Sequence, residues 1–119
     1  MGEPRLLYVT TETRDEARSI GEILVNRKLC ACVNILDGME SMYFWEGEVQ
    51  SGKECILLVK TTSVYVEEVT SAILENHSYE VPCVISLPFS ETEGNSEYLQ
   101  WIKNSVGNPN EKSKYATSN

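Results

Sequence analysis

The chain has one histidine, His77, and a cysteine, Cys83, follows it six residues later. Imidazole nitrogen and thiolate sulfur are side-chain ligands that copper and zinc prefer. Cys32, in a segment expected to form a strand, is a third candidate ligand. A closed zinc site needs four ligands, so Glu80, water or a neighbouring subunit would have to complete the pair. These residues predict weak or transient binding of copper or another divalent cation, and no firmly held cofactor.

Each candidate ligand also has a purely structural interpretation, which the sequence leaves open. His77 follows an expected helix, where the helix dipole can stabilise a histidine. Cys32 fits equally well as a packed core thiol. None of the four cysteines belongs to a Cys-x-x-Cys pair, so neither a zinc finger nor a thioredoxin-like redox site is expected.

A second set of residues combines aromatic rings with one cation and one acid. Such side chains can line a pocket for a small anion or metabolite, and we expect this pocket to lie between subunits. Alternatively, the rings anchor a subunit interface and the lysine pairs with the glutamate. No nucleophile is placed beside the histidine in an evident triad, so the chain is not expected to be an enzyme. The set consists of Tyr43, Trp45, Lys60, Glu80 and Trp101.

The length and charge of the chain limit its class. Its 119 residues fit one domain. The net charge of −8 argues against a nucleic-acid partner, because phosphate binding needs clustered lysine and arginine. No apolar run reaches the roughly 20 residues of a membrane span, so membrane insertion is not expected. The N-terminus has no signal-peptide pattern, and a cytoplasmic protein with reduced thiols is expected.

Hydrophobic periodicity predicts alternating strands and helices in the order β-α-β-β-α-β, followed by a third helix. This order is typical of a ferredoxin-like α+β fold, in which helices cover one face of an antiparallel sheet. Asp37-Gly38 is expected to end the second strand, and Ser63 to cap the second helix. The domain is expected to cover residues 1–107, before a disordered polar tail at 108–119. Expected strands cover residues 6–11, 29–36, 42–61 (a hairpin turning at 46–47) and 84–87, and expected helices 13–28, 63–76 and 95–107.

Two features of this arrangement predict an oligomer. The second face of the sheet needs a cover, and the central hairpin is too long for a compact single domain. Tyr43, Phe44 and Trp45 lie together near the tip of this hairpin arm, where joint exposure of three aromatic rings would be costly. We therefore expect each arm to pack on a neighbouring subunit.

Several motifs, in matching order, resemble the CutA1 family of divalent-cation tolerance proteins. They run from Leu6 to about Val106, nearly all of the expected domain. The motifs are Leu29-Cys30-Ala31-Cys32-Val33-Asn34, Ser41-Met42-Tyr43-Phe44-Trp45-Glu46-Gly47, Val59-Lys60-Thr61, His77-Ser78-Tyr79-Glu80 and Tyr98-Leu99-Gln100-Trp101.

The resemblance implies a ferredoxin-like subunit in a stable homotrimer, with a role in tolerance of copper and other divalent metals. An alternative is a trimeric scaffold, similar in architecture to PII proteins, or an anchoring module that binds a protein or small molecule at its intersubunit clefts. Some animal relatives resemble accessory proteins that anchor acetylcholinesterase. This chain departs from the family pattern at Ser78, where proline is usual, and at Cys83, where glutamate is usual. The second change favours softer metals, such as copper(I) or zinc.

Overall fold

The computed structural model describes residues 2–107, and the tail expected at 108–119 lies outside them. The order of elements agrees with the sequence analysis, apart from a short 3-10 helix (Ser63–Tyr65) before the second α-helix. Ser63 therefore does not cap that helix, whose first turn follows directly from the 3-10 turn. The elements are β1 (Pro4–Thr11), α1 (Arg14–Asn26), β2 (Cys32–Trp45), β3 (Glu48–Thr62), α2 (Val66–Asn76), β4 (Val84–Pro88) and α3 (Ser96–Ser105).

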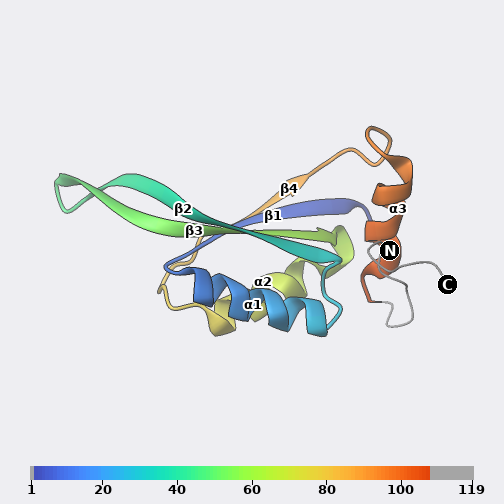
Figure 1. Ribbon diagram of the computed structural model, residues 1–119, viewed down its shortest axis with the longest axis horizontal. Coiled ribbons are helices and arrows are strands. Elements are labelled where there is room, and N and C mark those ends of the chain that lie inside the picture. The colour runs from blue at the N-terminus through green and yellow to red at the C-terminus, as the bar shows by residue number, and fades with distance from the viewer. Residues whose placement is uncertain (1, 108–119) are drawn as a thin grey trace.

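The four strands form one antiparallel sheet in the order β2-β3-β1-β4. Helices α1 and α2 lie side by side against one face of this sheet (Figure 1). Alternate strand residues, such as Leu7 and Val59, point to this face and are fully buried with Ile20 and Ile73 of the helices. The ferredoxin-like α+β fold is thus confirmed.

Helix α1 begins as its sequence predicts, with a capping interaction at Thr13. The Thr13 side chain accepts a hydrogen bond from the backbone N–H of Glu16, at 3.1 Å. The Glu16 carboxylate accepts from the N–H of Glu12, at 3.1 Å, one residue before the position of an ordinary capping box. The first bond satisfies a backbone donor that the start of a helix leaves free, and the second holds the residue just before the cap.

Strands β2 and β3 extend beyond the body of the molecule as a long arm (Figure 1). Its turn uses Glu46 and Gly47, both with positive φ, as a two-residue hairpin turn requires. The predicted end of a strand at Asp37-Gly38 was wrong, because β2 runs through both residues. The strand continues, and its register shifts between Leu36 and Met39. Leu36 pairs with Ile56 and Met39 with Glu54, so β2 has one more residue than β3 between these two pairs. A β-bulge absorbs the two turn-forming residues without ending the pairing.

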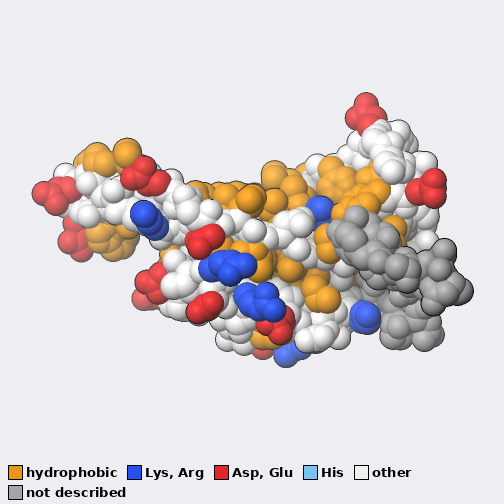
Figure 2. Space-filling model, viewed as in Figure 1, with side chains coloured by type: hydrophobic (Ala, Val, Ile, Leu, Met, Phe, Trp, Pro, Cys, Tyr) orange, Lys and Arg blue, Asp and Glu red, His pale blue; other side chains and the backbone are white. Residues whose placement is uncertain are grey.

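The sheet face opposite α1 and α2 is covered only in part. Helix α3 packs on one end of it, where Tyr98 contacts Cys32 and Lys60. Leu36, Ile85 and Leu87 are about half exposed on apolar strands. Figure 2 shows hydrophobic side chains gathered along this open face, between the arm and α3. No helix within residues 2–107 is long and apolar enough to cross a membrane.

Candidate functional site

A groove of about 950 Å³ runs along the arm to its base, beside the segment that joins α2 to β4. It brings together members of both predicted sets, because Tyr43 and Trp45 reach it from the arm and Cys83 from the start of β4. It is lined by Thr10, Glu12, Ser41, Tyr43, Trp45, Gln50, Gly52, Lys53, Glu54, Tyr79, Val81 and Cys83.

Glu54 is the groove acid that two hydroxyl groups hold in place, and it was not among the predicted site residues. Its carboxylate accepts hydrogen bonds from the Tyr79 hydroxyl, at 2.7 Å, and from the Ser41 hydroxyl. Burial, together with the bond to Glu54 and the negative charge of its carboxylate, raises the pKa of Tyr79 well above its usual value. The phenol is therefore a fixed proton donor to Glu54 and not a base.

His77 lies behind the groove wall, with its side chain fully buried. Its Nε2 is 2.7 Å from the carbonyl oxygen of Thr10, and its Nδ1 is 3.1 Å from the N–H of Tyr79. A carbonyl can only accept and an N–H can only donate, so this network assigns the neutral form with hydrogen on Nε2. The imidazole would have to give up one of these bonds to bind a metal, and its role as a ligand stays a prediction.

Cys32 lies at the other end of the sheet, beneath α3. Its sulfur is 3.8 Å from the Tyr98 hydroxyl, which also accepts a hydrogen bond from Lys60 Nζ, at 3.0 Å. The rings of Tyr98 and Trp101 are 5.5 Å apart between centroids. Tyr98 is therefore the centre of a cluster that contains three predicted site residues, although it was not itself predicted as a site residue.

One subunit does not unite the predicted five-residue pocket. Tyr43 pairs with Gln50, which is ten residues from Lys60 on β3, or about 33 Å along a strand. Tyr43 and Trp45 thus belong to the groove, and Lys60 and Trp101 to the α3 cluster, while Glu80 does not line the groove. Only a neighbouring chain could join the two groups, so the intersubunit pocket stays a prediction.

The four cysteines are free and differ in accessibility. Burial raises the pKa of Cys30 to about 12, with a smaller effect from Cys32, and burial also raises the pKa of Cys55. Cys32 and Cys83 are partly exposed. Within residues 2–107, no group of three or more His, Cys, Asp or Glu side chains is placed to hold a metal ion. A metal bound at Cys83 would therefore need water or a neighbouring chain to complete its ligands.

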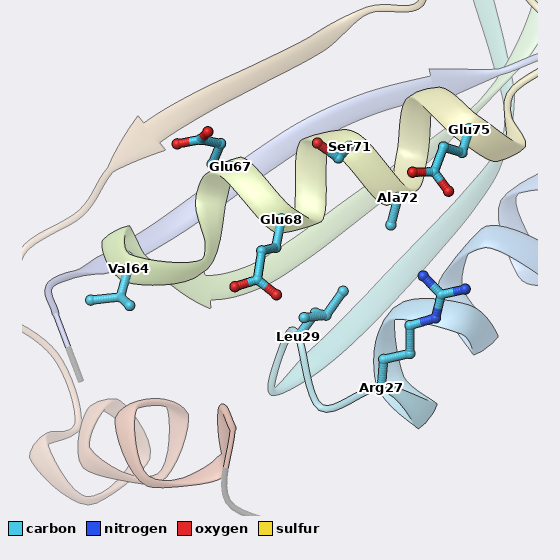
Figure 3. A pocket seen from close by; sticks show the side chains of 8 residues that line it. All are labelled: Arg27, Leu29, Val64, Glu67, Glu68, Ser71, Ala72 and Glu75. Atoms are coloured by element: carbon cyan, nitrogen blue, oxygen red, sulfur yellow. The ribbon is translucent and has the colours of Figure 1, made fainter.

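A second hollow, of about 610 Å³, lies between the end of α1 and the outer side of α2. Figure 3 shows Arg27 reaching from α1 toward α2, where Glu68 and Glu75 border the hollow. This hollow contains none of the predicted site residues. Its charged lining residues are one arginine and three glutamates, and the groove at the arm is the better candidate for a functional site.

Comparison with known proteins settles the family. A family model described as "CutA1 divalent ion tolerance protein" matches residues 5–105. The chain belongs to the CutA1 family. It is 39% identical over 102 residues to a divalent-cation tolerance protein CutA from Thermus thermophilus, covering 86% of this chain and 97% of that protein.

Plant and bacterial CutA1 proteins extend this comparison. Over 103 residues the chain is 45% identical to a chloroplastic CutA protein from Arabidopsis thaliana, covering 87% of this chain and 56% of that protein. The chain thus spans about half the length of this plant relative. The crystal structure of a CutA1 from Ehrlichia chaffeensis matches with a TM-score of 0.82 and 36% identity, covering 90% of this chain and 98% of that one.

Proposed function

We propose that this CutA1-family chain acts in the response to divalent metal ions and binds copper or another divalent cation weakly. The observation that carries the proposal is the position of Cys83, whose partly exposed side chain lines the groove with Glu12 and Glu54. A thiolate is a ligand that copper(I) and zinc prefer, and water or a neighbouring chain would supply the others. The Thermus relative is named as a divalent-cation tolerance protein, which supports the proposal.

Calorimetry of the reduced protein with Cu(I), Cu(II) and Zn(II) tests the metal site. We expect Cys83→Ser to weaken binding at least ten-fold, while Ser86→Ala, on strand β4 directly after Cys83, binds as the wild type does. His77→Gln and Cys32→Ser test the other two predicted ligands separately. Isotherms of Cys83→Ser that match the wild type would contradict the groove as the metal site.

We further propose that the working form is a homotrimer. The half-exposed apolar face of the sheet and the exposed aromatic residues of the arm support an assembly in which neighbours cover both. Light scattering at micromolar concentration should give three times the 13.4 kDa mass of the chain. A monomer mass would refute this proposal.

We also propose an alternative role in binding a partner, and a role without catalysis. A protein or small-molecule partner at an intersubunit cleft is the alternative role, supported by the exposed rings of Tyr43 and Trp45. A non-enzymatic role is consistent with the engagement of both His77 nitrogens by the backbone. A cytoplasmic location has no support from relatives, because one is named chloroplastic and an Archaeoglobus structure is described as periplasmic.

A further inference from the structure

Residues 77–83 connect α2 to β4, and hydrogen bonds tie their first three residues to three other elements. His77 contacts the backbone of Thr10 on β1, Ser78 binds Glu16 on α1, and Tyr79 binds Glu54 on β3. We infer that this segment is a strap that fixes the base of the arm to the body, with Glu16 attaching it to helix α1 and Glu54 attaching it to the arm. Its role is conformational, and it needs no metal.

The Glu16 carboxylate holds the strap to helix α1. One oxygen accepts from the N–H of Ser78, at 2.6 Å, and the other from the N–H of Glu12, at 3.1 Å. The Glu16 side chain is only 14% exposed, although the residues that donate to it, Glu12 and Ser78, lie at the surface. Hydrogen bonds from backbone N–H groups to a carboxylate are stronger than neutral ones, which suits a fixed attachment.

The buried imidazole of His77 then shapes the turn from inside. Its Nδ1 accepts from the N–H of Tyr79, while its Nε2 contacts β1 through the carbonyl of Thr10. The rings of His77 and Tyr79 are 4.9 Å apart between centroids. The histidine thus sets the direction in which the Tyr79 side chain leaves the strap.

The Glu54 carboxylate attaches the strap to the arm. It accepts from Tyr79 of the strap and from Ser41 of β2, so one side chain joins both strands of the arm to the strap. Glu54 pairs with Met39, the first residue after the register shift. A bulge locally disrupts the ladder and bends its strand, so this attachment lies where the arm needs support.

The strap also forms part of the groove wall, because Tyr79, Val81 and Cys83 all line the groove. Its conformation therefore controls the shape of the groove and the position of the arm together. A change that releases either carboxylate would alter both, whatever ligand the groove receives.

Residue-resolved amide hydrogen exchange of the full chain without metal tests the inference. We expect Glu16→Ala to speed exchange of the Ser78 amide at least ten-fold. Tyr79→Phe, which removes only the hydroxyl, should speed exchange of amides 39–42 at the arm base at least three-fold and leave Ser78 slow. Tyr43→Phe removes a hydroxyl from the same arm without touching the strap, and should leave both regions unchanged.

Two results would overturn the inference. One is an arm base in Tyr79→Phe that exchanges at the wild-type rate, and the other is a Ser78 amide that exchanges equally fast with and without the Glu16 carboxylate. Core amides of Leu7 and Val9 report whether a variant is folded.

If Glu16→Ala unfolds, Ser78→Pro provides a second test of the same attachment. It removes the donor, and the backbone of His77 (φ −98, ψ 142) already suits a following proline. Glu16→Gln should then lower the thermal midpoint less in the Ser78→Pro background than in the wild type. An equal loss in both backgrounds would contradict the attachment.

Discussion

His77 is the only imidazole of the chain, and the subunit uses both of its nitrogens for structure. The sequence alone could not distinguish this structural role from metal binding. A histidine in either role can be the only one in the chain and can lie six residues before a cysteine. The structural role depends on a contact between His77 and the carbonyl of Thr10, which lies 67 residues earlier in the sequence.

The residue types of Cys83, Tyr43 and Trp45 were enough to select them as site candidates, and all three line the groove. Glu54 and Tyr79 were missed, because their pairing depends on strand register and on the path of the strap.

The four thiols should divide into two reactive and two protected residues. At pH 8 in the native protein, we expect iodoacetamide to modify Cys32 and Cys83, which are partly exposed. Cys30 should resist, because a pKa of about 12 leaves roughly one thiolate in 10⁴ molecules. Cys55 is fully buried and should also resist. Peptide mass spectrometry reads each site, and modification of Cys30 as fast as Cys83 would contradict the buried position.

Glu16 should make stability depend on pH in the acidic range. Burial alone would raise its pKa, but hydrogen bonds from Ser78 and Glu12 outweigh burial and lower it. Its stabilising effect is therefore present above the unfolded pKa of about 4.3, and is lost as the pH falls through the lower folded pKa.

Urea unfolding at fixed protein concentration should show this effect. We expect Glu16→Gln to be less stable than the wild type at pH 6, and the difference to shrink by pH 2–3. Glu75→Gln, on the exposed side of α2, is the control and should show a smaller change. A gap between wild type and Glu16→Gln that widens toward low pH would contradict the assignment.

At the scale of elements, helix α1 packs closely on the edge strand through Gly21. A β-carbon at this position would lie 2.9 Å from Cγ2 of Val33. Alanine favours a helix over glycine by about 1 kcal/mol, but overpacking in a well-filled core costs about 1–3 kcal/mol. We therefore expect Gly21→Ala to destabilise the protein despite its better helix propensity.

A double-mutant cycle in thermal unfolding separates these two effects. Val33→Ala removes the close neighbour, so Gly21→Ala should become neutral or stabilising in that background. Ser19→Ala, on the exposed side of the same helix, is the control for helix propensity alone. If Gly21→Ala stabilises the wild-type background, helix propensity outweighs the close contact.

The order of elements was predictable from periodicity, and the local deviations were not. Buried β-branched and leucine runs predicted the central strands, and Thr13 predicted the start of α1. Asp37-Gly38 has the composition of a chain break, but pairing with β3 on both sides keeps it within a strand. Ser63 resembles a cap, but its side chain accepts from the N–H of Glu3 at 3.0 Å, which connects it to the start of β1.

At the scale of the whole molecule, helices cover one face of the sheet more completely than the other. Helices α1 and α2 bury one face, while the other keeps Leu36, Ile85 and Leu87 about half exposed. Together with an arm that extends the longest dimension to 56 Å, this asymmetry supports the proposed assembly.

Introducing charge on the open face should disrupt the assembly. We expect Ile85→Asp combined with Leu87→Asp to reduce the mass measured by light scattering to that of a single chain. The control is Leu74→Asp, a similarly exposed leucine on helix α2 at 51% exposure. If the control dissociates as readily as the double variant, the open sheet face is not the contact surface.

The bulge between Leu36 and Met39 determines which aromatic residues the arm presents to the groove. Its extra residue reverses the alternation of side chains, so that Met39, Ser41, Tyr43 and Trp45 follow Leu36 on one face. Loss of one residue at Asp37-Gly38 would restore regular pairing and keep Tyr43 and Trp45 on this face, whereas loss of both residues would exchange them for Met42 and Phe44. The composition of the arm would hardly change, yet its hydroxyl and indole groups would leave the groove.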